Sequence, residues 1–441
     1  MNDKGFFKQI NVIPIFVIIG LLFAGVSISL YQIKQSLTER DLPDIAEKES
    51  ELSFSFFWEE VNDDPDSPGF GLIRDRAPGN PELSSTASIG FGLTAIAIAT
   101  ERGWITEAAA EQRLAGTLDT LLTRAAHENG VFYHFLEMSD ASRAPGSEVS
   151  IIDTALLVSG ALTAGEYFGG DIQQKAEELY RRVNWDWYRN SATNQFYMSY
   201  SPESGFSGAW DFYAEQLLMY VLGAGSPTYP TKPDMFYDFT REERAFRDGD
   251  PFIYSWFGSI FTHQFSHAWI DFRGYRDREG VDWFANSIKA SEASQAFSIY
   301  YADQYQTFGS GSWGLTASDG PDGYKGEYGS SPSGANDQAH FTDGTIPPAG
   351  AAGSIVFTPE AALEALEHYA TIPELSGEYG FVDAYNLDVS PAWFADDVIG
   401  INKGITLLMI ENYRSEFVWK YFMQNDYVQQ GIERIGLKKT D

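Results

Sequence analysis

Residues 151–183, IIDTALLVSGALTAGEYFGGDIQQKAEELYRRV, decide the fold of this chain. No proline interrupts either half, and Gly169-Gly170 supplies a helix stop between the two halves. The stretch therefore predicts two helices, 151–168 and 171–183, which a short turn joins as a packed pair. Repetition of this unit along the chain predicts an all-α protein.

Similar units flank this pair. Residues 84–101 open on Ser/Thr, contain small residues such as Gly90 that let helices approach closely, and close at Gly103. An amphipathic partner is expected at 106–126. Later helices are expected at 212–222, 281–301, 359–369 and 404–421, the last with a break near Arg414-Ser415. Helix pairs around one centre, with long loops such as 307–352 gathered at one end, predict an α/α toroid.

The composition narrows the class of ligand. The chain has 441 residues, of which 44% are hydrophobic and 15% aromatic, as in a globular protein with a large core. It carries 30 basic and 62 acidic side chains, a net charge of −32, which disfavours nucleic acid and other polyanions as partners and favours a neutral ligand. Such acidity is typical of proteins that stay soluble in salt. The chain has no cysteine, so disulfides and thiolate metal sites are excluded.

The N-terminal part predicts a membrane anchor. An uncharged run follows Lys8, and its apolar part, 10–30, is long enough to span a bilayer. It exceeds a typical cleavable signal and shows no small-x-small cleavage site, so residues 10–32 are expected to be an uncleaved signal anchor. The expected order is a cytoplasmic segment 1–9, the anchor 10–32, a charged linker 33–51 and a folded domain 52–441.

A large acidic domain after one N-terminal span usually lies outside the cytoplasm. We therefore expect a single-pass protein of a bacterial inner membrane, with its domain in the periplasm or outside the cell. Secretion after cleavage of the N-terminal segment is the alternative. The oligomeric state is left open.

Two acidic segments, 147–155 and 210–216, set carboxylates among aromatic and apolar neighbours at expected helix starts. Two carboxyl groups in unlike surroundings can act as acid and base, or as acid and nucleophile, which glycosidic bond cleavage requires. Apolar neighbours on almost every side should raise the pKa of Glu215, as suits a general acid, although a buried pair with Arg is an alternative. Asp211, four residues earlier, would share its helix face or cap the helix.

The first acidic segment leaves more alternatives open. Glu148 precedes the expected helix in a loop, where it is either presented at the mouth of a toroid or simply solvated. Ser150 and Asp153 have the spacing of an N-terminal cap, so Asp153 either acts in the chemistry or stabilises free N–H groups of the helix.

Other polar motifs favour sugar binding over metal binding. His263 and His267 have a spacing that suits zinc, but Gln264 stands where a metalloprotease has Glu, and no third ligand is near. We expect no metal and no cofactor, and instead hydrogen bonds to sugar hydroxyls together with Asp271 and Arg273.

Trp313, with aromatic residues near it, could stack on a pyranose ring or belong to the core. Asp319 and Asp343 lie in Gly-rich turn sequences, in which Asp stabilises the backbone.

Eight segments occur in an order that resembles the glucoamylase-like domain family. They are TASIGFGLTA at 86–95, GVFYHF at 130–135, SEVSIIDTALL at 147–157, FGSIFTHQFSHAWIDFRG at 257–274, WGLTASDGP at 313–321, DGTIPPAGAAGSIVF at 343–357, YGFVDAYN at 379–386 and LLMIENYR at 407–414. The family includes bacterial β-1,2-glucanases of glycoside hydrolase family 144, and related domains occur in cyclic β-1,2-glucan synthases. The resemblance covers about residues 54–425.

The resemblance implies an (α/α)6 barrel with the sugar lying across its mouth. It also implies that Glu215 is the general acid and that Glu148 matches a position that acts in catalysis in the synthase-related domains. Asp383, in the GFVDAYN segment, is the candidate for the base that activates water. Asp153, Asp396 and Asp397 compete with it for that role.

Two departures from the family pattern stand out. Relatives commonly read Asn-Glu-Ala around the acid, whereas this chain reads Ala214-Glu215-Gln216. Asp-Gln-Gly is usual where this chain has Asn402-Lys403-Gly404. Asn402 cannot serve as a base, and Lys403 is expected to reach a sugar subsite.

The sequence therefore predicts a glycoside hydrolase that acts on a neutral β-glucan, above all β-1,2-glucan. The alternatives are a β-glucan transglycosylase with Glu148 as nucleophile, and a non-catalytic glycan-binding protein of the envelope. The catalytic candidates are Glu215, Glu148, Asp383 and Asp153. The side chains expected to bind the sugar are Tyr133, Arg143, Trp210, Asp211, Tyr213, His263, Gln264, His267, Asp271, Arg273, Trp313, Asp319, Asp343 and Glu411.

Overall fold

The helix pair at 151–183 is present in the computed structural model, which describes residues 39–440. Helix α5 (Ile151–Phe168) begins after Ser150, whose hydroxyl accepts a hydrogen bond from the Asp153 N–H, and it ends at Gly169. Helix α6 (Gly170–Arg182) follows at once. The Ser150 cap satisfies an N–H group that a helix start would otherwise leave unpaired.

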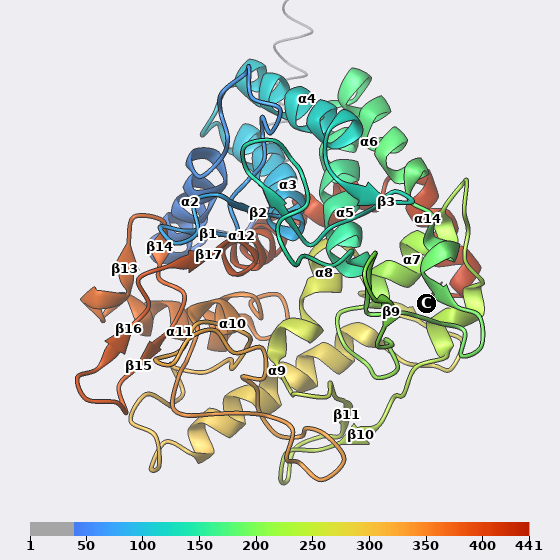
Figure 1. The fold of residues 1–441 in the computed structure, drawn as a ribbon. Helices are drawn as coiled ribbons and strands as arrows, with labels where there is room; N and C mark the ends of the chain where they lie inside the picture. The colour runs from blue at the N-terminus through green and yellow to red at the C-terminus, as the bar shows by residue number, and fades with distance from the viewer. Residues whose placement is uncertain (1–38, 441) are drawn as a thin grey trace, which may run out of the picture. The chain divides into compact units, whose positions relative to one another are not determined.

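Helices α3 (Thr86–Arg102) and α4 (Glu107–Thr123) form the second expected pair. The hydroxyl of Ser85 caps α3, which ends at Gly103 with φ 72°, a left-handed conformation that glycine adopts without strain. Figure 1 shows α3 and α5 lying in the interior, with α4 and α6 outside them.

The two interior helices touch backbone to backbone. A Cβ atom at Gly160 of α5 would lie 1.9 Å from the Gly90 carbonyl oxygen of α3, and a Cβ at Gly90 would lie 2.4 Å from the Leu156 oxygen. The small residues of these helices therefore permit the close approach that the sequence indicates.

The remaining helices agree with most expectations. The expected ones are α7 (Leu217–Gly225), α9 (Trp283–Tyr300), α11 (Pro359–Ala370), α12 (Gly400–Ser415) and α13 (Phe417–Phe422). The break between α12 and α13 falls at Glu416, with φ 59°. Helices that the sequence did not predict are α2 (Asp44–Glu59), α8 (Phe265–Trp269), α10 (Pro348–Ala352) and α14 (Asp426–Ile435), with 3-10 turns at Trp185–Tyr188, Pro233–Tyr237, Ile260–His263 and Pro373–Leu375. The described part of the chain is mostly helical.

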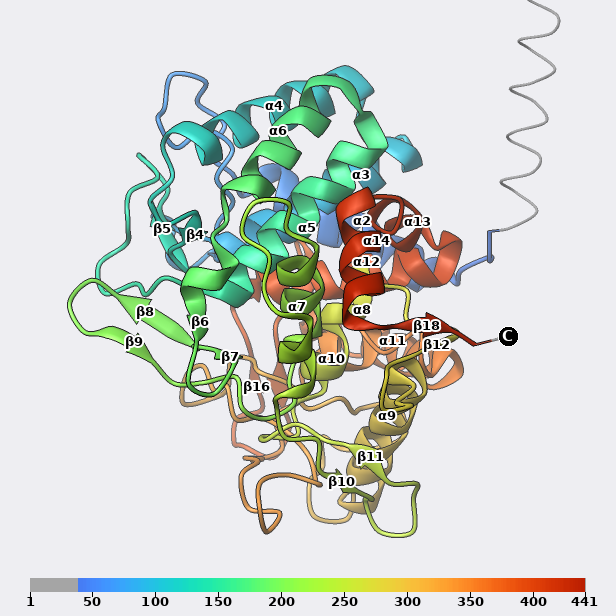
Figure 2. The ribbon, with the colours of Figure 1, turned by 90° about the vertical axis from the view of Figure 1, so that its right-hand side faces the viewer.

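Short antiparallel strand pairs join the helices. They are β1 (Arg76–Ala77) with β17 (Val398–Ile399), β2 (Leu83–Ser85) with β5 (Phe135–Glu137), β3 (His127–Glu128) with β4 (Val131–Phe132), β6 (Arg189–Asn190) with β7 (Gln195–Phe196), β8 (Ser199–Ser201) with β9 (Gly205–Ser207), β10 (Glu243–Arg244) with β11 (Phe252–Ile253), β12 (Tyr275–Arg276) with β18 (Lys438–Lys439), β13 (Ser376–Gly377) with β14 (Gly380–Phe381), and β15 (Tyr385–Asn386) with β16 (Trp393–Phe394). Strands β4 and β5 and the hairpin β8–β9 lie on the side of the body away from α13 (Figure 2).

The expectation that residues 33–51 form a linker is wrong for the last part of this range. Helix α2 begins at Asp44, and the compact unit of the chain begins at Leu42. Glu49, in the part expected to be linker, is buried and forms an ion pair of 2.5 Å with Lys403 of α12, while Glu47 pairs with Arg414. The charges that indicated a solvated linker are the charges that dock α2 onto α12.

The expected membrane anchor at 10–32 lies outside the described residues. Between residues 39 and 440, no helix is both long enough and apolar enough to cross a bilayer.

Candidate active site

A cleft of about 940 Å³ opens in front of the turn that carries Glu215. Its walls include Trp256, Phe257 and Tyr324, residues that are 45%, 41% and 48% exposed. Trp210 and Glu242 also line it. Exposed aromatic rings beside carboxylates offer both stacking faces and hydrogen-bond acceptors, the two kinds of contact that an uncharged polar ligand needs.

Glu215 lies in the turn before α7, because that helix begins at Leu217 and not at residue 212 as expected. The amide of Gln216 folds back to accept from the Ala214 N–H at 2.5 Å and to donate to the Phe212 carbonyl at 2.8 Å. Residues 211–213 are thereby extended, and the expectation that Asp211 and Glu215 share one helix face is wrong.

The position of Glu215 is fixed from behind. The Ser266 hydroxyl of α8 donates to the Glu215 carbonyl oxygen at 2.5 Å and accepts from the Leu218 N–H at 3.1 Å. Burial raises the pKa of the Glu215 carboxyl to about 7, and the negative charge of Asp153 adds to this shift. A carboxyl group in this state still carries a proton at neutral pH and can donate it.

A second group of polar side chains centres on His134. Its Nδ1 lies 2.8 Å from Glu148 Oε1, and its Nε2 lies 3.8 Å from Asp153 Oδ1. Burial opposes the charge of the imidazole, but the carboxylates of Asp153 and Glu148 outweigh it and raise the pKa of His134 to about 9. The hydrogen bond with His134 in turn lowers the pKa of Glu148. Glu148 is therefore an ionised carboxylate, and Asp153, in the first turn of α5, faces a cation.

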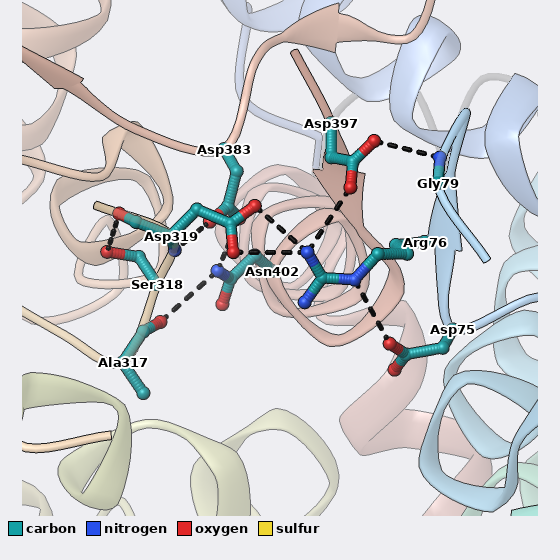
Figure 3. Close-up of polar contacts among 9 residues, drawn as sticks. All are labelled: Asp75, Arg76, Gly79, Ala317, Ser318, Asp319, Asp383, Asp397 and Asn402. Carbon is teal, nitrogen blue, oxygen red and sulfur yellow. Dashed lines mark hydrogen bonds and ion pairs between the residues drawn. The ribbon is translucent and has the colours of Figure 1, made fainter. Parts of the chain in front are cut away.

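A third group surrounds Asp383, in the segment between β14 and β15 (Figure 3). The Asn402 amide donates to Asp383 Oδ1 at 2.7 Å, and the Asp319 backbone N–H donates to Oδ2 at 2.7 Å. Burial, reinforced by the charge of Asp319, raises the pKa of Asp383 to about 7. Both carboxylate oxygens are thus held in place, and the group can take up or release a proton near neutral pH.

The groups around Glu215 and Asp383 border the same cleft. Ala317 lines the cleft, and its carbonyl oxygen accepts from the Asn402 amide at 3.3 Å. Tyr324 lines the cleft too. The pKa of its hydroxyl is raised mainly by burial and, to a smaller extent, by the negative charges of Asp383 and Asp75. Segments near residues 75, 215, 320 and 383 therefore meet at one place.

Several residues expected to bind sugar belong to the core instead. His263 and His267 are buried, and burial lowers the pKa of each to about 3, so both imidazoles are neutral. His263 contacts the Tyr213 hydroxyl at 3.3 Å and His267 contacts the Ser287 hydroxyl at 2.9 Å. Gln264 donates to the Gly350 carbonyl at 2.8 Å. These three side chains therefore stabilise the buried segment 263–267, in which Ser266 contacts Glu215.

Trp313, Glu411 and Asp343 are also placed away from the cleft surface. Trp313 is fully buried, so the expectation of a stacking face is wrong. Glu411 is buried and pairs with Arg102, which ties α12 to α3. Asp343 accepts from the Tyr328 hydroxyl at 2.8 Å and from the Thr345 N–H at 3.0 Å, as its turn sequence indicates.

Asp271 and Arg273 form an ion pair of 2.8 Å on another surface, where Arg273 also lies over Trp419. Asp271 and Trp419 line a separate pocket of about 350 Å³. The expectation that this pair contacts sugar beside His263 is wrong, because His263 is buried and Asp271 lines a different pocket.

Tyr133 and Arg143 brace the loop of Glu148. The Arg143 guanidinium lies 4.9 Å from the centre of the Tyr133 ring, and its Nε donates to the Ser147 carbonyl at 2.6 Å. Trp210, Asp211 and Tyr213 line the cleft. Their contact with sugar stays a prediction. Lys403, expected to reach a subsite, is instead buried against Glu49.

Sequence reasoning missed four side chains that organise the site: Asp75, Arg76, His134 and Trp256. His134 stands in one of the family-like segments and could have been noticed there. Arg76 offers no local signal, since its partners lie 243 and 321 residues away. Within residues 39–440, no three His, Cys, Asp or Glu side chains are arranged to hold a metal ion.

A helical body in which Glu215 lines an aromatic cleft, while the buried Asp383 adjoins it through Asn402 and Ala317, agrees with the arrangement that the glucoamylase-like motifs imply. Residues 207–426 match the Glycoamylase family model, described as "Putative glucoamylase". This match confirms the resemblance to the glucoamylase-like domain family.

Particular relatives are named for β-1,2-glucan chemistry. The exo β-1,2-glucooligosaccharide sophorohydrolase (non-reducing end) of Parabacteroides distasonis is 28% identical over 443 residues, which include 90% of this chain. This chain spans 58% of that relative's length. The endo-β-1,2-glucanase of Chitinophaga pinensis, solved with sophorotriose and glucose, is 25% identical with a TM-score of 0.79, over 90% of this chain and 99% of that one. A β-1,2-glucanase structure from P. distasonis is 27% identical with a TM-score of 0.77, over 90% and 60%.

Proposed function

We propose that this protein is a glycoside hydrolase that cleaves β-1,2-linked glucan, with Glu215 as the general acid. The proposal rests on one observation: the Glu215 carboxyl, with a pKa of about 7, lies on the wall of a 940 Å³ aromatic cleft. Cleavage of a glycosidic bond requires an acid that still holds its proton at working pH. The substrate class follows from the relatives, and a neutral glucan suits a protein with a net charge of −32.

Asp383 is the proposed base. Its two oxygens are oriented by Asn402 and Asp319, and its pKa of about 7 lets it accept a proton from water. Asp397 is instead engaged by Arg76 and the Gly79 N–H, and Asp153 faces His134. Asp396 is exposed to solvent.

The architecture proposed around these groups is an (α/α)6 barrel with the cleft across its mouth. The nested pairs α3–α4 and α5–α6 support it. The uncharged run at 10–32 supports a further proposal, namely that the N-terminal segment anchors the protein in a membrane with the domain outside the cytoplasm.

The direct test is release of reducing ends from linear β-1,2-glucan. We expect Glu215→Gln to lower kcat roughly 10²- to 10⁴-fold, because Gln keeps the shape but has no proton to give. Glu367→Gln, which changes an exposed carboxylate on α11, is the matched control and should keep wild-type activity. Equal activity of wild type and Glu215→Gln would overturn the assignment.

Glu148 supports a second candidate, transglycosylation. Its carboxylate is partly exposed, with 38% of the side chain accessible, and His134 keeps it ionised, as a nucleophile requires. Accumulation of longer or cyclic glucans without a net gain of reducing ends would favour this reaction. Binding of β-1,2-glucan that survives Glu215→Gln, with no product from wild type, would instead identify a glycan-binding protein.

A further inference from the structure

Arg76 lies at the centre of three carboxylates that come from distant parts of the chain (Figure 3). Its NH1 group contacts both Asp319 oxygens, at 3.0 and 3.1 Å, and Asp397 Oδ2 at 3.2 Å. Its Nε contacts Asp75 Oδ2 at 3.4 Å. Only 18% of the Arg76 side chain is exposed, so these contacts are shielded from bulk solvent.

The Arg76 guanidinium is itself held from two directions. Arg76 belongs to β1, which pairs with β17 so that Arg76 lies opposite Ile399. Asp397, just before β17, accepts from the Gly79 N–H at 2.9 Å as well as from Arg76. The guanidinium of Arg76 is therefore held in a fixed position beside the strand pair β1–β17, which we call the β1–β17 wall.

Asp319 links this wall to Asp383. Its side chain binds Arg76, while its backbone N–H donates to Asp383 Oδ2 at 2.7 Å. Asp319 lies in the long connection between α9 and α10, which contains no helix or named strand between residues 301 and 347. The ion pair with Arg76 is thus the contact that ties this part of the connection to the β1–β17 wall.

We infer that Arg76 is a positioning residue for Asp383: by holding the Asp319 carboxylate, it fixes the backbone N–H that orients the Asp383 carboxylate. The inference rests on the proposed function, in which Asp383 is the base. Arg76 forms no bond with Asp383 itself and acts through Asp319.

The charged groups that face Asp383 shift its pKa in opposite directions, so the effect of each can be measured separately. The Asp319 carboxylate raises the pKa of Asp383, and the Arg76 guanidinium lowers it. Tyr324 faces Asp383 from the cleft, and Lys403 with Glu49 shares a buried cavity of about 10 Å³ with it. Loss of the Arg76 charge should therefore raise the pKa of Asp383, whereas loss of the Asp319 charge should lower it.

The experiment compares Arg76→Gln, Asp319→Asn and Arg76→Lys by the pH dependence of kcat/KM on β-1,2-glucan. We expect the acidic limb to move up by roughly one pH unit in Arg76→Gln and down by a similar amount in Asp319→Asn. Arg76→Lys keeps the positive charge but loses the planar guanidinium that contacts several carboxylates at once. The acidic limb of its pH profile should therefore stay near that of wild type while kcat falls. Arg124→Gln, at an exposed position, is the control and should match wild type.

A merely structural role of Arg76 would lower activity and thermal stability without moving the limb, and that result would overturn the inference. Shifts of the same sign in Arg76→Gln and Asp319→Asn would overturn it too. An inactive wild type would refute the proposed function but not this inference. In that case ¹³C-carboxyl NMR, with the Asp383 signal assigned by its absence in Asp383→Asn, follows the titration directly. Unchanged titration of Asp383 in both variants would then overturn the inference.

Discussion

Glu215 and Asp383 illustrate how burial, reinforced by a neighbouring carboxylate, can prepare two carboxyl groups for complementary tasks. Both have pKa values near 7, Glu215 with Asp153 as its charged neighbour and Asp383 with Asp319. The hydrogen bonds differ, since Asp383 receives one on each oxygen from donors that favour its ionised form. The two groups can therefore hold opposite protonation states at the same pH.

We expect the pH dependence of kcat/KM to be a narrow bell with its maximum near pH 7. Asp383 must be ionised, so activity falls as the pH drops below its pKa of about 7. Glu215 must be protonated, so activity falls as the pH rises above its pKa of about 7. Initial rates between about pH 5 and 9 measure this, with circular dichroism to show that the fold persists. A flat profile across that range would contradict both assignments.

The sequence revealed Glu215 through its apolar neighbours, a local signal. It revealed Asp383 only through the family-like segment, because the groups that define its chemistry are distant in the chain. Asn402, which looked like a lost acid, is the donor that orients Asp383, and only the fold shows this. His263 and His267 were expected to hydrogen-bond sugar hydroxyls because their burial cannot be read from their spacing in the sequence.

At the scale of elements, the backbone contact between α3 and α5 limits which residues these helices can carry where they touch. Gly160→Ala should destabilise the protein by roughly 1–3 kcal/mol, because the new methyl group would overlap the Gly90 carbonyl. Gly165→Ala on the same helix is the matched control: its Cβ would meet its nearest neighbours at 3.1 Å, and it gains the same helix propensity. Urea unfolding of both variants gives the comparison. Equal stabilities would show that the two helices can move apart freely.

Elements with local start and stop signals could be predicted. Ser85 and Gly103 bound α3, and Ser150 and Gly169 bound α5, so these helices were placed to within two residues. The start of α7 was misplaced because an apolar run continues back to Phe212, while the Gln216 amide and the pairing of Phe212 with Thr240 hold the chain extended there. Helix α2 was missed because its charges find their partners more than 350 residues away.

For the whole molecule, the net charge of −32 sets the response to salt. Repulsion among like charges destabilises the compact state, and salt screens it. Raising NaCl from about 0.1 to 1 M shortens the Debye length from roughly 10 to 3 Å, so Tm should rise. Sucrose at equal osmolality serves as the control for solvent exclusion. A Tm that falls with NaCl would mean that ion pairs such as Arg76 with Asp319 outweigh the overall repulsion.

The contacts of Arg76 also determine when, during synthesis of the chain, the site can form. They join residue 76 to residues 319 and 397, and so they need both an early and a late part of the chain. A chain still emerging from the ribosome lacks these contacts until residue 397 has been made and has left the ribosome. The nascent protein is therefore without an assembled site until that point.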